Sequence, residues 1–259
     1  MKATVTVLGS GTSMGVPTIG CDCAVCRSED TRDRRTRPSV MLQWDGRVVL
    51  IDTAPDFREQ ALRESIHRVD AVLYSHGHAD HILGLDDLRP LTFARVTGGA
   101  RVPLYAQPAT AAVISSVFKY VFDDDYKYGG IARVALHEIE GPFELFGARV
   151  VPIPVVHGDA EITGFRLGSF AYLTDLSSLP EPSFAMLEGL DLLFLDALRH
   201  KPHPTHSTVE QALAITERLR PRQTFFIHIC HDLPHAATEA ALPAGVRLAY
   251  DGMKVEFEL

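Results

Sequence analysis

The stretch Ser75-His76-Gly77-His78-Ala79-Asp80-His81 places four potential metal ligands within six consecutive positions from His76 onward. The apolar residues 70–74 before it predict a buried strand, and residues 82–85 after it predict the start of a helix. The ligands are therefore expected on a loop between a strand and a helix, where a rigid scaffold can aim them.

The donor types in this stretch indicate which ions it can bind. Neutral imidazoles and a carboxylate suit zinc, manganese or iron rather than calcium. On a tight loop, His76 and His78 can converge on one ion while Asp80 and His81 face a second. The competing interpretation is a solvated histidine-rich turn, which a run of four ligands makes much less favourable than a single histidine would.

Length and composition are those of an ordinary globular protein. The chain has 259 residues, of which 46% are hydrophobic and 22% charged, and it shows no internal repeat or low-complexity linker, so we expect one domain over residues 1–259. The formal net charge of -8 argues against a broad nucleic-acid surface, and extended nucleic acid is not an expected partner. The first residues alternate like a strand, without a signal-peptide core or a membrane span, so we expect a cytoplasmic protein with no membrane partner.

Three of the four cysteines, Cys21, Cys23 and Cys26, lie within six residues. Such close spacing is poor for disulfides and good for a structural zinc in a reducing compartment, although one ligand is missing. The Gly/Ser-rich residues 9–17 do not match a P-loop and are expected to pack closely beside the site. Residues 27–37 contain five arginines and three acidic residues; a solvated loop is favoured there over phosphate steering.

Turn and helix signals outline the rest of the chain. Asp45-Gly46 between residues 40–44 and 47–52 predicts a hairpin, as do the neighbouring segments 164–167 and 169–173. Helices are expected over residues 55–66 and from about residue 109 to residue 121. The acidic triplet 123–125 is expected to be solvated, while a substrate lid or a dimer contact is the functional alternative for this region.

Further candidate ligands follow predicted strands. His157, Asp175 and His228 each stand at a strand end, and each would be weak evidence alone. After the buried strand 191–196, a proline-containing loop carries His200, His203 and His206, which resembles the wall of a site. The residues from Ser207 to Glu210 then fit a capping box, so His206 is expected at a helix N-terminus, where an anion is favoured.

The order of these motifs resembles the metallo-β-lactamase superfamily of hydrolases over nearly the whole chain. The resemblance implies an α/β (α+β) fold, an αββα sandwich of two mixed β-sheets flanked by helices, with two divalent metals, zinc or manganese, at the strand ends. It also implies the ligands: His76, His78 and His157 for one metal, Asp80, His81 and His228 for the other, and Asp175 between both. Main-class lactam-hydrolysing members use a cysteine at the second metal, and no cysteine lies between Cys26 and Cys230.

Residues 9–26, 228–231 and 250–253 look more specifically like the phosphoribosyl 1,2-cyclic phosphate phosphodiesterases of phosphonate breakdown. That likeness implies that His231 completes a structural zinc site with the three cysteines in a loop over about residues 9–37, and that the protein is a homodimer. Cys230 competes with His231, but on a continuing strand its side chain should point into the core. The same group implies a role for His206 in phosphate chemistry and none for His200 or His203.

The expected function is two-metal hydrolysis of a small phosphodiester, such as phosphoribosyl 1,2-cyclic phosphate, to a phosphomonoester, with His206 and Asp80 as catalytic residues and His206 as proton donor. A tRNA 3′ processing endonuclease resembles the chain at the metal ligands but carries a basic arm. A glyoxalase II-like thioester hydrolase shares the metal set and lacks the cysteines. The remaining alternative is a noncatalytic, zinc-stabilised interaction module.

Overall fold

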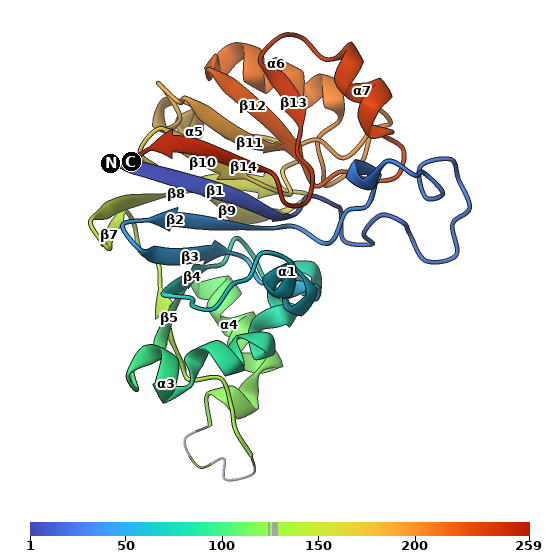
Figure 1. Cartoon of the computed structure of the whole chain (residues 1–259). Helices are drawn as coiled ribbons and strands as arrows, with labels where there is room; N and C mark the ends of the chain where they lie inside the picture. The colour runs from blue at the N-terminus through green and yellow to red at the C-terminus, as the bar shows by residue number, and fades with distance from the viewer. Residues whose placement is uncertain (124, 126–128) are drawn as a thin grey trace.

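The computed structural model describes residues 1–123, 125 and 129–259, and its strands form two sheets that pack face to face (Figure 1). The acidic triplet lies partly outside these residues, because Asp124 is not among them. Within the described part of the chain each sheet has seven strands. No helix there combines the length and apolar character that crossing a bilayer requires.

The first sheet contains the N-terminal strands and the C-terminal strand. Its order is β14-β1-β2-β3-β4-β5-β6, antiparallel from β14 to β3 and parallel from β3 to β6. Figure 1 shows the two chain ends side by side, because β14 pairs with β1. The strands are β1 (Lys2–Gly9), β2 (Ser39–Trp44), β3 (Arg47–Ile51), β4 (Ala71–Leu73), β5 (Val102–Ala106), β6 (Val134–Glu138) and β14 (Lys254–Glu258).

The second sheet repeats this mixed arrangement. Its order is β13-β12-β11-β10-β9-β8-β7, parallel from β13 to β10 and antiparallel from β10 to β7. The strands are β7 (Phe143–Leu145), β8 (Ala148–His157), β9 (Ala160–Leu167), β10 (Phe170–Leu173), β11 (Leu192–Asp196), β12 (Gln223–Ile227) and β13 (Val246–Leu248).

Helices cover the outer face of each sheet. One apolar cluster lies between the sheets, a second joins the first sheet to α1 and α4, and a third joins the second sheet to α5 and α6. The α-helices are α1 (Phe57–Arg63), α2 (Ala79–Ile82), α3 (Ala94–Thr97), α4 (Pro108–Val117), α5 (Glu181–Met186), α6 (Val209–Leu219) and α7 (His235–Ala241). The short 3₁₀ helices are η1 (Thr31–Asp33), η2 (Leu83–Thr92) and η3 (Lys119–Val121). The expected αββα sandwich is therefore confirmed.

Both predicted hairpins form, as β2–β3 and β9–β10, but the predicted helices are longer than the observed ones. The helix expected over residues 55–66 ends at Arg63, since the backbone at Ser65 adopts a left-handed conformation with φ of 53°. The helix expected to reach residue 121 ends at Val117, where Phe118 leaves helical geometry, and a separate 3₁₀ turn follows.

The predicted capping box is displaced by one residue. Thr208, not Ser207, is the N-cap of α6, and its side chain and backbone exchange hydrogen bonds with Gln211. The Ser207 hydroxyl donates instead to the carbonyl of Leu176, so its side chain is directed to that carbonyl rather than to the first turn of α6. His206 consequently lies two residues before the N-cap.

The N-terminal loop packs as closely as the glycines suggested. A Cβ atom on Gly9 would lie 1.9 Å from the carbonyl oxygen of Arg37, so only glycine fits there. The expectation of a solvated loop over residues 27–37 is wrong for Asp33 and Arg35, which are buried. An arginine-rich composition alone did not reveal that these two side chains turn inward.

The Arg35 guanidinium joins the N-terminal loop to the C-terminal part of the chain. Its Nη1 donates to the hydroxyl of Ser10 at 2.9 Å and to the carbonyl of Ala249 at 2.5 Å, and its Nη2 lies 2.9 Å from Nδ1 of His235. Asp251 supports the contact with Ser10, since its Oδ1 accepts hydrogen bonds from the amide and the hydroxyl of Ser10. The guanidinium therefore bridges segments 200 or more residues apart in the sequence.

Replacement of Arg35 by alanine should destabilise the protein. The change removes the guanidinium from the Ala249 carbonyl and from Nδ1 of His235, and it leaves the Ser10 hydroxyl with Asp251 alone, so the free energy of unfolding should fall by roughly 2–4 kcal/mol. Arg34→Ala is the matched control, because Arg34 is exposed and should change stability by less than about 0.5 kcal/mol. Urea unfolding of the three proteins measures both effects, and equal stabilities of the two variants would contradict this role of Arg35.

Candidate active site

The predicted ligands come together because their strands end at one edge of the sandwich. β3 and β4 are parallel, and so are β10, β11 and β12. β8 runs antiparallel to β9, which is antiparallel to β10, so β8 also ends on the same side. The loop after β4 and the ends of β8, β10 and β12 therefore carry all seven ligands proposed from the sequence to one place.

One group consists of His76, His78, His157 and Asp175, whose potential ligand atoms all lie within 4.8 Å of one another. Nε2 of His76 is 2.9 Å from Nδ1 of His78 and 3.8 Å from Oδ2 of Asp175. Three imidazoles and one carboxylate oxygen thus face a common centre.

The second group consists of Asp80, His81, Asp175 and His228, again with ligand atoms within 4.8 Å of one another. Nε2 of His81 lies 3.2 Å from Oδ2 of Asp80 and 3.3 Å from Oδ1 of Asp175. Nε2 of His228 lies 3.4 Å from the other oxygen of Asp175. Asp175 belongs to both groups, which is the position that the resemblance implied for it.

The electrostatics of the site favour a cation. Burial favours the protonated acid at Asp175, but the neighbouring His228 and His81 outweigh it and hold the pKa of this carboxyl well below its usual range. Burial opposes the charging of His81, yet the carboxylates of Asp175 and Asp80 hold its pKa well above the usual range. Metal binding requires deprotonated carboxylates and releases the imidazole protons.

The residues present fit divalent metals. Among the described residues, Oδ2 of Asp80, Nε2 of His81 and Nε2 of His228 are buried polar atoms without a hydrogen-bond partner, and all three point toward Asp175 or its neighbours in the second group. A buried polar atom without a partner costs about 1–3 kcal/mol, and a coordinated cation removes that cost. Oxygen and nitrogen donors of this kind suit zinc, manganese or iron.

Asp52 supports the site and has no role in the sequence-based prediction. Its Oδ2 lies 2.8 Å from Nδ1 of His81 and accepts a hydrogen bond from the hydroxyl of Ser75, while its Oδ1 accepts one from the amide of Ser75. The carboxylate therefore orients the His81 ring so that Nε2 faces the site. The available signal was an acidic residue directly after a buried strand.

Asp196 has a similar position at the end of β11. Its Oδ2 lies 3.3 Å from Nδ1 of His206 and accepts a hydrogen bond from the amide of Ser207, and its Oδ1 lies 3.6 Å from Nδ1 of His228. The His206 ring lies 5.0 Å from the His157 ring and 4.6 Å from the His228 ring, centroid to centroid. His206 therefore lines the site, as predicted, and Asp196 turns its Nε2 inward.

The other two histidines of this loop are farther from the ligands. His203 packs against His206 at a ring distance of 5.0 Å, and its Nδ1 accepts a hydrogen bond from the amide of Thr205. His200 is exposed and pairs with Glu210 at 2.7 Å. His200 thus lies on the surface rather than on the wall of the site.

Three of the site residues have left-handed backbone conformations: Asp52 with φ of 64°, Asp175 with φ of 56° and His228 with φ of 62°. Each follows a strand, and the left-handed turn redirects its side chain into the site. This conformation costs roughly 1–3 kcal/mol for residues other than glycine, and such strain is concentrated at functional sites. The surrounding hydrogen bonds and packing must maintain it.

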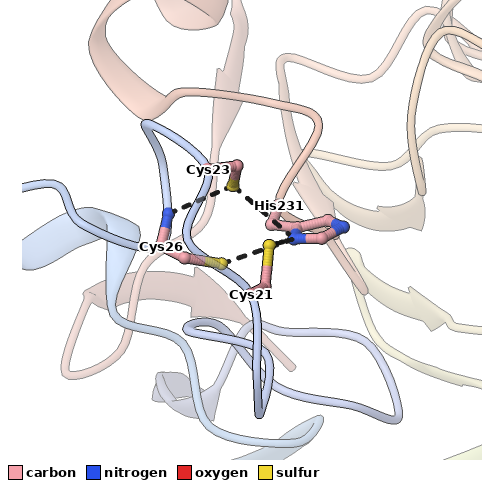
Figure 2. A group of neighbouring side chains, drawn as sticks. All are labelled: Cys21, Cys23, Cys26 and His231. Atoms are coloured by element: carbon pink, nitrogen blue, oxygen red, sulfur yellow. Dashed lines mark hydrogen bonds between the residues drawn. The ribbon is translucent and has the colours of Figure 1, made fainter.

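The three N-terminal cysteines meet His231, as Figure 2 shows. The sulfur atoms of Cys21, Cys23 and Cys26 lie 3.2, 3.7 and 3.3 Å from Nδ1 of His231. Sulfur and nitrogen ligands of a tetrahedral zinc are roughly 3.6 Å apart, so the four residues fit that ion. The amide of Cys26 donates to the sulfur of Cys23 and lowers the pKa of that thiol.

Cys230 is buried and lies outside this group, as predicted, but the reason differs. β12 ends at Ile227, so residues 228–231 do not continue the alternation of a strand. The Cys230 sulfur instead accepts a hydrogen bond from the amide of Asp232, while His231 turns toward the cysteine loop. Gly11 forms a bridge with Ile229, and this contact places the loop next to His228.

Comparison with known proteins agrees with this geometry. Residues 47–229 match the family model described as the beta-lactamase superfamily domain. A protein of Porphyromonas gingivalis named octanoyltransferase is 39% identical over 253 residues, which is 96% of this chain and 50% of that protein. This chain therefore spans about half of the length of that relative.

Solved structures show the same fold over the whole chain. The crystal structure of a diphosphatase described as a new member of the PhnP family is 63% identical, with a TM-score of 0.95 over 100% of this chain and 98% of the other. Zn²⁺-bound PqqB from Methylobacterium extorquens is 23% identical, with a TM-score of 0.78 over 97% and 99% of the two chains, which supports the fold. On the matched family model, which agrees with the observed sandwich, the chain belongs to the beta-lactamase superfamily.

Proposed function

We propose that this protein hydrolyses a small phosphodiester, such as a cyclic sugar phosphate, to a phosphomonoester at a site with two divalent metals, zinc or manganese. The observation that carries the proposal is the pair of ligand groups sharing Asp175. Two bound cations would supply a water of lowered pKa and positive charge for the phosphoryl oxygens. The free cysteines suit a reducing compartment, and we place the protein in the cytoplasm.

The residues of the first group are His76, His78 and His157, those of the second are Asp80, His81 and His228, and Asp175 serves both. Asp52 orients His81, and the carbonyl of Thr205, 2.8 Å from Nδ1 of His157, orients that ring. Such outer contacts fix the ring nitrogen that faces the metal. Asp80 belongs to the catalytic set through its place in the second group.

His206 is the proposed proton donor to the leaving oxygen. The Asp196 carboxylate accepts the hydrogen bond from Nδ1 of His206. The proton available to a substrate is therefore on Nε2 of His206, whose ring lies near those of His157 and His228. The Asp196 carboxylate also holds the ring in this orientation.

A diphosphate linkage is the second candidate substrate. It is favoured by the 63% identical diphosphatase of the PhnP family, whose chain this protein matches over nearly its full length. Cleavage of a phosphoanhydride would use the same metal pair, with phosphate as the leaving group. The two candidates differ in what His206 must do, because a phosphate leaves more easily than an alkoxide.

The metal-loaded protein should release p-nitrophenol from bis(p-nitrophenyl) phosphate, and the metal-stripped protein should not. Steady-state rates with zinc or manganese measure this. A panel of a cyclic sugar phosphate, a nucleoside diphosphate sugar, a glutathione thioester and a pre-tRNA then ranks the substrates. Inertness toward every phosphodiester with several metals bound would remove the proposal, and preference for the thioester or the tRNA would replace it.

His206→Gln should slow the hydrolysis of alkyl diesters by about 10²–10⁴ in kcat, because an alkoxide needs a proton to leave. p-Nitrophenyl esters, whose leaving group needs none, should be affected far less, and bound metal should stay unchanged. His200→Gln is the matched control, since His200 is exposed, and should retain the wild-type kcat. An equal loss on both classes of ester would contradict proton donation by His206.

We also propose that Cys21, Cys23, Cys26 and His231 hold a structural zinc. Elemental analysis should then find three metal ions per chain, and Cys21→Ser should lower the count by one and reduce the midpoint of thermal unfolding. Cys230→Ser is the control, because this buried thiol lies outside the group and its loss should leave the count at three. A variant C21S with an unchanged metal content would refute the assignment.

A further inference from the structure

A cavity of about 220 Å³ opens beside the first ligand group. His76, His78 and His157 line it on one side. The first turns of α4 and the start of β9 form the other walls. A substrate whose phosphoryl group lies at the ligand groups therefore has one neighbouring space for a substituent here.

The chemistry of the other walls is mainly apolar. No lysine or arginine lines the cavity among the described residues, and its charged residue is Glu161, whose carboxylate is exposed and makes no hydrogen bond or ion pair within the described part of the chain. A second phosphate would be repelled there, whereas a hydroxyl could donate to Glu161. The apolar walls are Ala109, Val113, Ala160 and Ile162.

The cavity and His206 lie on different sides of the site. Neither His206 nor Asp196 lines the cavity, and His157 stands between, with its ring 5.1 Å from the His78 ring and 5.0 Å from the His206 ring. A leaving group protonated by His206 departs on the far side. In a linear diester, the substituent that reaches the cavity is therefore the one that stays on the phosphate.

The width of the cavity is set by close packing. A Cβ atom on Gly77 would lie 3.0 Å from the Cβ atom of Val113, so α4 is in contact with the ligand loop and has little freedom to move toward it. Val113 is 39% exposed and projects from this helix at the cavity. Its side chain thus limits the size of an incoming group.

We infer that the cavity between α4 and the start of β9 is the subsite for the uncharged organic substituent that the phosphomonoester product of a linear diester retains, with Val113 setting its size and Glu161 excluding anionic groups. This rests on the proposed phosphodiesterase function and names the part of the substrate that the function left open. A sugar-like group meets both requirements, since its carbons face apolar walls and its hydroxyls face a carboxylate.

The test compares p-nitrophenyl phenyl phosphate with p-nitrophenyl methyl phosphate, which share a leaving group and differ in the retained one. Val113→Phe should lower kcat/KM for the phenyl ester about tenfold or more and leave the methyl ester within about twofold. Val113→Ala should instead raise the ratio of kcat/KM for the phenyl ester to kcat/KM for the methyl ester. Val117→Phe, one turn farther along the exposed face of α4 and outside the cavity, is the matched control and should change neither rate.

Charge selection is tested with a 4-carboxyphenyl p-nitrophenyl diester. The wild type should prefer the uncharged phenyl ester, and Glu161→Gln should reduce that preference about threefold or more. An unchanged preference would overturn the role of Glu161. Glu161→Asp, which keeps the negative charge, should keep the preference for the uncharged ester.

Binding separates this inference from the proposed function. Calorimetry with the metal-loaded protein compares phenylphosphonate with methylphosphonate, and Val113→Phe should weaken the phenyl compound selectively. If the wild type cleaves no diester but this selectivity holds, the proposed function fails and the subsite stands. If both esters are cleaved and Val113→Phe behaves like Val117→Phe in rate and binding, the subsite is refuted and the function stands.

Discussion

The direction of the strands is the constraint on which the rest of this structure depends. Six strands from both sheets, β3, β4, β8, β10, β11 and β12, end at the same edge, so short loops from distant parts of the sequence meet there. Three apolar clusters fix the four layers and hence this edge. A ligand arrangement of this kind needs no long loop, because the sheets do the positioning.

Holding these side chains together is costly without a cation. The site buries carboxylates and imidazoles at 3.2–3.8 Å from one another, and left-handed backbone at Asp52, Asp175 and His228 adds strain. Hydrogen bonds from Nδ1 of His81 and of His206 to the carboxylates of Asp52 and Asp196 keep these rings oriented. The N-terminal loop, which also carries the cysteines, is held by the Arg35 guanidinium and by the bridge from Gly11 to Ile229, next to His228. Structural and catalytic groups are therefore mechanically linked.

The part of the site predicted from sequence was the part that local pattern encodes. The spacing of the potential ligands in residues 75–81 and of the cysteines was enough to predict metal binding. The order of the strand-end histidines in the sequence supported their assignment as further ligands. Asp52 and Asp196 were not assigned, because a strand-end aspartate is usually a cap or a turn residue. The inward turn of Arg35 was missed since charge composition does not specify which side chain is buried. The capping residue shifted by one because Ser207 bonds to Leu176, a contact far away in sequence.

The sequence by itself determined the ligand types, the mixed β-rich pattern with its hairpins, and the family, because each depends on residue identity and short-range spacing. Single-domain organisation and dimerisation stay predictions. Only the tertiary structure decided which oxygen or nitrogen faces which centre, and that a cavity lined by no lysine or arginine of the described residues lies beside His78. The physical reason is that these properties depend on the packing of two sheets against each other, and the distance between residues such as His76 and Asp175 is not encoded in local pattern.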